Sequence, residues 1–290
     1  MALRLRRAVT VAAAAVVFVI LAGATYQGAT TALERRQFPH PGRLVDVGGH
    51  QLHIDCRGSG TPTVVLEAPA VGMSAAWGWI QPAVAATTRV CSYDRAGLGW
   101  SEAGDEPFTP GSVARELRIL LERTGEAAPY VIVGHGLGAA FAVLDAAQLG
   151  SAASGLLLVD APAADGSGSL DAPEMRLVRA SPWLARAGIL RATGLIAGSA
   201  DGLPDQAAGA LRAFLNRPDH LTRAARELRS WDDTLRLAAG TALPHNPSIV
   251  HLEVESGDRM AFLTAQDDAE RVARAVIALV AELREAGQGH

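Results

Sequence analysis

One short stretch has the spacing of a site for covalent catalysis. The apolar run Tyr130–Val133 predicts a buried strand, and Ala139–Leu144 predicts the beginning of a helix. Between them lies Gly-His-Gly-Leu-Gly, residues 134–138, so glycines flank one central residue. This is the geometry of a nucleophile elbow, which lifts the central residue to the top of a sheet. Covalent catalysis needs Ser, Cys or Asp there, whereas this chain has Gly136, which has no side chain.

The elements that must position the elbow alternate along the chain. A hairpin is predicted around Gly48-Gly49, and a helix is predicted from Pro110 with Thr109 as its cap. Further buried strands are predicted at Thr63–Glu67, Arg89–Tyr93, Leu156–Val159 and Ser248–Val254, and a last helix over Asp267–Glu285. This alternation predicts an α/β fold with a mostly parallel sheet flanked by helices. Short amphipathic helices over about 165–240 predict an inserted helical cap.

Composition limits the class of protein. With 290 residues, 49% hydrophobic and 19% charged, the chain can form one large α/β domain or two small ones, and disorder is not expected. The net charge of −4 gives no sign of nucleic-acid binding. The Gly-rich loop after Tyr93 lacks both phosphate-binding spacings, and His50, His53 and Cys56 alternate between strand faces. No cofactor or metal is therefore expected.

The N-terminus predicts a membrane segment over residues 1–26. Basic residues at positions 4, 6 and 7 precede the uncharged run Ala8–Tyr26, which is about 28 Å long as a helix, close to a bilayer core. An uncleaved anchor is favoured by the length of the run. A cleaved signal peptide stays open because Ala22-Gly23-Ala24 fits a cleavage site. Both interpretations export the rest of the chain, with residues 27–41 as a linker.

Taken together, the order of elements resembles the α/β-hydrolase family over residues 42–283. The most specific likeness is the elbow frame of Gly134, Gly136 and Gly138, and Tyr93-Asp94-Arg95 is similar to the family's loop after its fourth strand. The resemblance implies an active site above the carboxyl ends of the strands, with catalytic residues in the order Ser, Asp or Glu, and His. It also points to exported or membrane-anchored bacterial members.

The chain departs from the family at the positions that carry its chemistry. Gly136 stands in the place of Ser. Ser256-Gly257-Asp258 resembles the family's Ser-Gly-His loop, so Asp258 stands in the place of His. An Asp cannot replace a neutral imidazole near pH 7, because its ordinary pKa is about 3.9 against about 6.5 for His. Pro69 occupies the place of an oxyanion-hole Gly, although Ala70 and Leu137 could still offer backbone N–H groups.

The acid of the family's triad is open in this chain. Asp160, directly after a predicted strand, is a possible acid, but without a base to orient it has no catalytic task. In an alternative alignment Asp258 is the acid and the His lies downstream, where only His290 remains. No predicted strand precedes His290, so this alignment ranks second.

Other side chains are candidates to replace the missing groups. His135 is expected to pack beneath the elbow, and His251 is separated from the His position by up to about 23 Å of extended chain. His245 lies in a Pro-flanked loop and stays open. Ser92 and Ser101 have no evident base. The effects of losing triad members do not add, so the second loss costs little once the first has occurred. Two departures together therefore suggest that selection for the reaction has lapsed.

The resemblance also bears on the two cysteines, Cys56 and Cys91. By the family's strand order the second and fourth strands are antiparallel neighbours, so Cys56 can approach the part of the fourth strand that holds Cys91. An exported protein matures in oxidising surroundings, so a disulfide between them is one hypothesis. Two buried free thiols are the other.

Three hypotheses about function follow. The first is a membrane-tethered α/β-hydrolase homologue without hydrolytic activity, a pseudoenzyme, whose pocket between sheet and cap binds a small apolar ligand or a partner protein. The second is an active esterase-like hydrolase with a catalytic arrangement that the sequence does not reveal. The third is a decaying gene product. The globular part, residues 42–290, is expected outside the cytoplasm, in the membrane-anchored or the secreted form.

Overall fold

A seven-stranded sheet is the centre of the structure, a computed structural model that describes residues 2–104, 108–163, 173–243, 246–254 and 262–288. Its strands are β1 (Arg43–Asp46), β2 (Gln51–Arg57), β3 (Thr63–Glu67), β4 (Val90–Tyr93), β5 (Tyr130–His135), β6 (Ala153–Val159) and β7 (Ser248–Leu252). They lie in the order β1-β2-β4-β3-β5-β6-β7. The pairs formed by β1 with β2 and by β2 with β4 are antiparallel, and the other pairs are parallel. The predicted α/β fold with a mostly parallel sheet is confirmed.

The register of β2 against β4 brings the two cysteines together. Cys56 lies directly opposite Cys91 in this antiparallel pair. The two sulfurs form a disulfide that joins positions 35 residues apart in the sequence. The structure thus adopts the first of the two alternatives for this pair, and neither sulfur is free to bind a metal.

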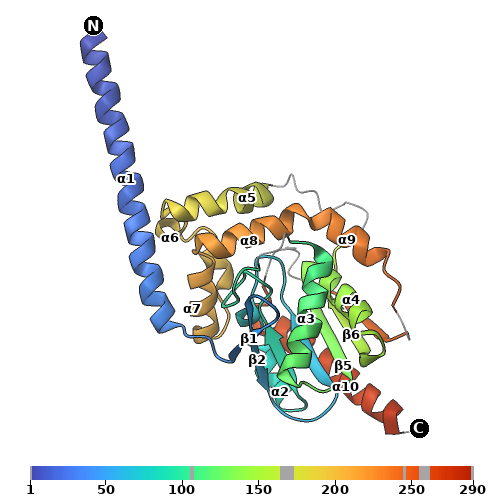
Figure 1. The fold of residues 1–290 in the computed structure, drawn as a ribbon. Helices are drawn as coiled ribbons and strands as arrows, with labels where there is room; N and C mark the ends of the chain where they lie inside the picture. Colours follow the sequence, from blue (N-terminus) through green and yellow to red (C-terminus); the bar gives the residue numbers. More distant parts are fainter. Residues whose placement is uncertain (1, 105–107, 164–172, 244–245, 255–261, 289–290) are drawn as a thin grey trace.

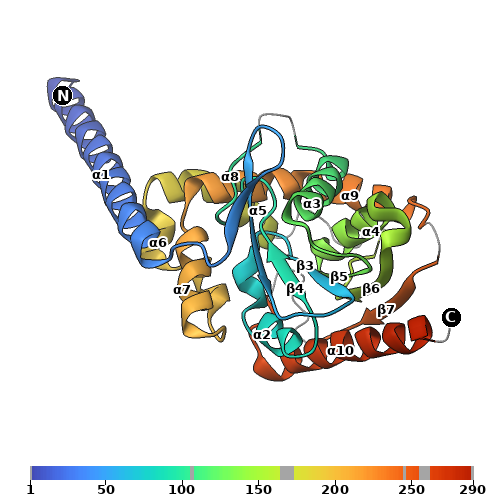
Figure 2. The same ribbon diagram turned by 60° about the horizontal axis from the view of Figure 1, so that its bottom comes forward.

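Helices cover both faces of the sheet because their apolar stripes match its two apolar faces. On one side lie α2 (Ile80–Ala85) and α10 (Gln266–Gln288), which contact each other (Figure 2). On the other side lie α3 (Pro110–Thr124) and α4 (Leu137–Leu149). Thr109 caps α3 as predicted, since its hydroxyl accepts a hydrogen bond from the Ser112 N–H at 3.1 Å. The described residues also form the 3₁₀ helices η1 (Ser74–Trp77) and η2 (Gly150–Ala152) in the body, and η3 (Ala197–Ala200) between the helices α6 and α7 described below.

A group of helices extends over the carboxyl end of the sheet (Figure 1). They are α5 (Pro173–Arg186), α6 (Ile189–Thr193), α7 (Asp205–Phe214), α8 (Pro218–Arg229) and α9 (Trp231–Ala239). Their buried apolar side chains join those of η1 and α4 in one cluster. We call this group the cap.

The N-terminal helix α1 (Ala2–Gln37) extends away from the body (Figure 1). Among the described helices, α1 alone is long and apolar enough to cross a membrane, with a mean hydropathy of 2.4 in its most apolar window. None of that window is buried in the body. A membrane anchor and a signal sequence both fit these properties.

The segment expected as a linker differs from the prediction over residues 27–37, which continue α1 as helix. The reason is tertiary contact. Gln27 Nε2 donates to the Asn216 carbonyl oxygen at 2.7 Å, and Glu34 forms an ion pair with Arg191 of the cap. These polar side chains therefore bind the cap, where the sequence pattern indicated only solvent-exposed chain.

Candidate active site

The elbow has the backbone of a nucleophile position and no side chain to use it. Gly136 has φ 56° and ψ −125°, in the region that L-residues with a side chain adopt only with strain. Its two flanking glycines are required by packing. A Cβ atom on Gly134 would lie 2.3 Å from the Gly138 carbonyl oxygen, and one on Gly138 would lie 2.5 Å from the Ala68 carbonyl oxygen. Strand, helix and the loop after β3 therefore meet at backbone contact.

The backbone N–H groups of Ala70 and Leu137 are the donors that the sequence analysis proposed for an oxyanion site. Ala70 follows β3, Leu137 opens α4 beside Gly136, and both residues are fully buried. Within the described part of the chain, neither N–H donates a backbone hydrogen bond. These donors fit the role expected of an oxyanion hole, although no nucleophile accompanies them in Gly136.

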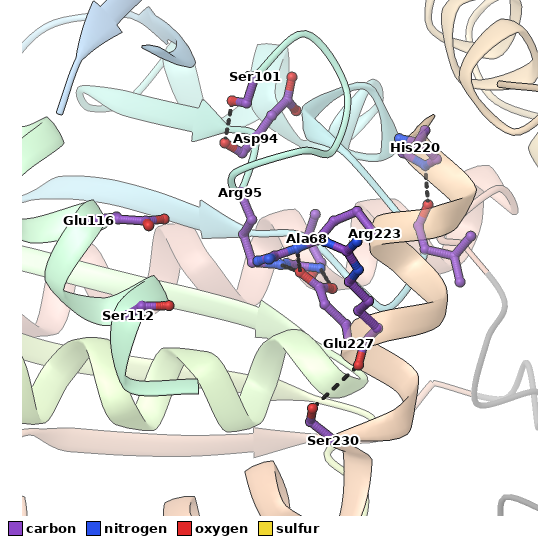
Figure 3. Close-up of polar contacts among 12 residues, drawn as sticks. Ala68, Asp94, Arg95, Ser101, Ser112, Glu116, His220, Arg223, Glu227 and Ser230 are labelled. Atoms are coloured by element: carbon purple, nitrogen blue, oxygen red, sulfur yellow. Dashed lines mark hydrogen bonds and ion pairs between the residues drawn. The ribbon is translucent and has the colours of Figure 1, made fainter. Parts of the chain in front are cut away.

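The Arg95 guanidinium connects this loop to the cap (Figure 3). It donates to the Ala68 carbonyl oxygen at 2.7 Å and to the Pro69 carbonyl oxygen at 3.2 Å, and it forms a buried ion pair with Glu67. Its Nε and Nη2 also bind both carboxylate oxygens of Glu227 in α8, at 3.0 and 2.9 Å. Arg95 is 2% exposed, so the sheet and the cap are joined by a dry, bidentate ion pair.

Three carboxyl groups and two guanidinium groups share this site. Burial would raise the pKa of Glu227, but Arg95 and Arg223 outweigh it and hold that pKa below its ordinary value. Burial raises the pKa of Glu67 despite Arg95, and it raises the pKa of Asp145 well above the ordinary value. Glu227 is therefore the carboxylate that the two guanidinium groups keep charged, while Asp145 retains its proton to a higher pH than usual.

A second cluster contains Ser, His and Asp, and no sequence pattern predicted it. His53 Nδ1 lies 3.0 Å from Asp94 Oδ2 and 3.5 Å from Ser74 Oγ, and all three residues are buried. A working triad uses one ring nitrogen for the acid and the other for the hydroxyl. Here both partners face Nδ1, which cannot donate to Asp94 and accept from Ser74 together. The three residues are far apart in sequence, so no motif could have announced them.

Asp94 has a structural task in this cluster. Its carboxylate accepts hydrogen bonds from the backbone N–H of Ser74 at 2.6 Å and of Trp100 at 2.9 Å. Burial would raise the pKa of Asp94, but the contact with His53 and these N–H groups hold it below the ordinary value. Asp94 thus fixes the loop after β4 against η1.

Asp160, the possible acid, lies at the end of β6 with φ 46°. Its Oδ1 accepts a hydrogen bond from the Val254 N–H at 2.8 Å, and its Oδ2 lies 3.5 Å from Nε2 of the buried His135. Asp160 and His135 therefore lie side by side, at the end of β6 and the end of β5.

The remaining sequence candidates lie in other environments. Ser92 Oγ donates to Gln81 Oε1 at 3.1 Å, and Ser101 Oγ donates to the Asp94 carbonyl oxygen at 2.6 Å, so both hydroxyls have structural partners. His251 is exposed on β7. Three candidates lie outside the described residues: His245, Asp258 and His290.

A cavity of about 250 Å³ lies beside the His53 cluster. It is bordered by the chain after α1, by η1 and α2, and by α7 of the cap, and Ser74 and Trp100 face it. Its other lining residues are partly apolar (Phe38, Pro39, Pro41, Ala75, Gly78, Pro82, Pro204, Ala207 and Ala210) and partly polar or charged (Asp55, Arg57, Gln81, Ser92 and Gln206). Gly136 does not line this cavity, which is therefore distinct from the elbow.

Comparison with known proteins gives a consistent assignment of the fold. Residues 58–290 match the model of the alpha/beta hydrolase family. The enol-lactonase from Burkholderia xenovorans LB400 has a similar structure, with a TM-score of 0.61 and 18% identity, covering 82% of this chain and 100% of that one. At this identity the likeness concerns the fold alone.

Two curated relatives match over shorter stretches. An uncharacterized protein of Schizosaccharomyces pombe is 34% identical over 120 residues, which cover 40% of this chain and 22% of that protein. An AB hydrolase superfamily protein of Gibberella zeae is 38% identical over 79 residues, which cover 27% of this chain and 24% of that protein. The matched stretches thus span less than a quarter of either relative.

Proposed function

The chain belongs to the alpha/beta hydrolase family, and we propose that it is a membrane-tethered member that binds a ligand or partner without hydrolysing it. The observation that carries this proposal is Gly136, which holds the backbone conformation of the elbow with no reactive atom. An oxyanion site and a pocket can bind a carbonyl compound, but covalent catalysis needs an attacking group. The proposed Asp258 at the His position would remove the general base as well.

The Arg95–Glu227 pair supports the same conclusion. It ties the loop that holds Ala70 to α8 of the cap through buried, charge-assisted hydrogen bonds. Removing one partner of a buried pair of this kind costs about 3–5 kcal/mol, so this pair is a strong connection between the loop and the cap. A hydrolase needs the space between the cap and the elbow for substrate entry and product release.

For the ligand, we propose a small, mainly apolar molecule in the cavity beside Ser74 and Trp100. The cavity volume of about 250 Å³ is below the roughly 300–1,000 Å³ of pockets for drug-sized molecules. Phe38, Pro39 and Pro204 give it apolar walls. The alternative to a small molecule is a segment of a partner protein bound at the same cavity.

The membrane tether is proposed from α1. Its apolar stretch is exposed and follows a basic flank at Arg4, Arg6 and Arg7, which predicts that the body lies outside the cytoplasm. The Cys56–Cys91 disulfide is typical of such an oxidising location. We propose residues 1–26 as the membrane segment of an exported bacterial protein, and residues 42–290 as its extracytoplasmic domain, with the cap inserted at about 165–240.

A second candidate function is hydrolysis that uses Ser74. The observation in its favour is that Ser74 lines the cavity and has its Oγ 3.5 Å from His53 Nδ1. The shared use of Nδ1 by Asp94 counts against it, because Ser74 then has no free base.

Turnover of short-chain p-nitrophenyl esters by the purified full-length chain tests both candidates. We expect the wild-type rate to equal the uncatalysed rate, and Ser74→Ala to leave it unchanged. The double variant Gly136→Ser, Asp258→His is the control for the scaffold, and activity in it would show that the elbow can still position a nucleophile. Wild-type turnover that Ser74→Ala abolishes would establish the second candidate, and turnover that survives Ser74→Ala would also refute the proposal.

A further inference from the structure

Direct backbone contact fixes the position of the cap along α1. A Cβ atom on Gly23 of α1 would lie 2.1 Å from the Ala187 carbonyl oxygen, and one on Gly188 would lie 2.9 Å from the Gly23 carbonyl oxygen. The turn between α5 and α6 therefore packs against α1 where neither helix can carry a larger residue. One turn further along, Arg191 Nε donates to Gln27 Oε1 at 2.9 Å. The turn cannot slide along the helix without losing both contacts.

This contact sets the depth of the cap relative to a membrane. Gly23 lies three residues before the end of the apolar run Ala8–Tyr26, which is about 4–5 Å along a helix. If α1 spans a bilayer, as proposed above, the end of this run marks the boundary between acyl chains and headgroups. The α5–α6 turn then lies at the same boundary, on the side of the body.

The surface around this turn has the composition of a membrane interface. Trp183 is 74% exposed, Ile189 45% and Leu195 59%, and all three lie within eight residues of the Ala187–Gly188 contact. The Arg186 guanidinium lies 5.2 Å from the centre of the Trp183 ring. Indole and guanidinium groups with apolar neighbours are typical of side chains at the level of the headgroups. We call these four residues the cap surface.

The helix α5, which holds Trp183 and Arg186, carries further exposed Arg side chains at positions farther from α1. Arg176, Arg179 and Trp183 are exposed at spacings of three and four along α5, while Val178 and Ala185 are buried against the cap. Figure 1 shows α5 running across the direction of α1, and both views place α6 beside α1. An amphipathic helix in this orientation can lie along a bilayer whose normal follows α1.

We propose that the cap surface docks on the outer leaflet of the bilayer that α1 spans, with Trp183, Ile189 and Leu195 among the upper acyl chains and Arg186 at the headgroups. The inference rests on the proposed tether and is independent of catalytic inactivity. Lipid is the occupant that fits, because the surface is continuous with α1, lies at the depth of the interface and mixes Arg with apolar side chains.

Quenching by lipids with brominated acyl chains tests the contact in the full-length protein. In a Trp183→Phe background, Ile189→Trp places an indole on the cap surface, and Ile249→Trp places one on β7. The two isoleucines are matched controls, since each is 45% exposed. After reconstitution in phosphatidylcholine vesicles, brominated lipid should remove at least half of the emission added by Ile189→Trp and almost none of that added by Ile249→Trp.

Flotation of the vesicles separates the premise from the inference. Protein that fails to float with the vesicles refutes the tether, and the docking proposal falls with it. Protein that floats but shows no quenching of Ile189→Trp overturns the docking surface alone. Equal quenching of both variants overturns it as well, because it indicates adsorption without a preferred face. Protection of Ile189→Trp from aqueous iodide without quenching by brominated lipid indicates a protein partner and also overturns the proposal.

Discussion

Gly136 has the backbone conformation of the elbow and no side chain. Its φ of 56° is one that a Ser would hold only under strain, and enzymes tolerate such strain because the nucleophile must project from the turn. Glycine adopts the same backbone conformation without a steric cost. The elbow of this chain therefore carries no steric strain at its central residue, which agrees with the proposed absence of a nucleophile there.

The buried carboxyl groups predict a specific response to pH. Burial raises the pKa of Asp145 well above its ordinary value, so the folded state holds the proton more tightly than the unfolded state. Above about pH 4, wild-type stability then falls with rising pH, by up to about 1.4 kcal/mol per unit until the folded-state pKa is passed. Asp145→Asn removes this titration. Urea unfolding should show its stability relative to wild type increasing from about pH 5 to about pH 8.

Glu227→Gln is the matched variant, and its stability relative to wild type should change with pH in the opposite direction. Arg95 and Arg223 hold the pKa of Glu227 below its ordinary value, so its carboxylate stabilises the fold above about pH 4. We expect the variant to lose about 3–5 kcal/mol near neutral pH and less as the pH falls through the folded-state pKa. A relative stability that does not vary with pH in either variant would contradict the description of this buried network.

At the residue scale, the sequence predicts what a local pattern encodes. Gly134, Gly136 and Gly138 were found because the elbow is a contiguous motif. The partnership of Arg95 with Glu227 was missed because 132 residues separate them, and no rule selects one Glu of the cap over another. The sequence indicated only half of this pair: Arg95 follows a buried strand closely, so a carboxylate partner can be expected, but its position cannot.

At the scale of elements, the pairing of β2 with β4 carries the disulfide. The two cysteines are 35 residues apart in the sequence. A disulfide that closes a loop of this length lowers the chain entropy of the unfolded state and thereby stabilises the fold by about 3–4 kcal/mol. The double variant Cys56→Ser, Cys91→Ser should lose about this much stability in chemical denaturation. A reductant should destabilise the wild type equally and leave the double variant unaffected. Two free thiols in the unreduced, denatured wild type would disprove the bridge.

The elements were predictable where apolar periodicity and caps agree, as in α3 and β5. They were less so where distant contacts decide. The helix α1 continues to Gln37 because its polar side chains reach Asn216 and Arg191, which the sequence pattern does not reveal. The same holds for α9 (Trp231–Ala239), because its apolar side chains are buried in the cluster formed with the rest of the cap.

At the scale of the whole molecule, α1 contacts the cap, and the cap in turn contacts the sheet. The helix α1 binds the cap through Gly23, Gln27 and Glu34. The cap binds the sheet through Glu227, and the Trp79 indole donates to the Gly202 carbonyl oxygen at 2.8 Å. These contacts connect α1 to the cap and the cap to the sheet, which supports the proposed binding role over one in which the cap must open in each turnover.

Our central proposal is that no serine of this protein acts as an activated nucleophile. The intact mass of the purified full-length chain after incubation with a fluorophosphonate measures this directly, because the reagent forms a covalent adduct with the activated serine of a hydrolase. An active serine esterase treated in parallel confirms the reagent. We predict an unchanged mass for this protein. A mass increase of one adduct, mapped by peptide analysis to Ser74 or to any other serine, would contradict the account.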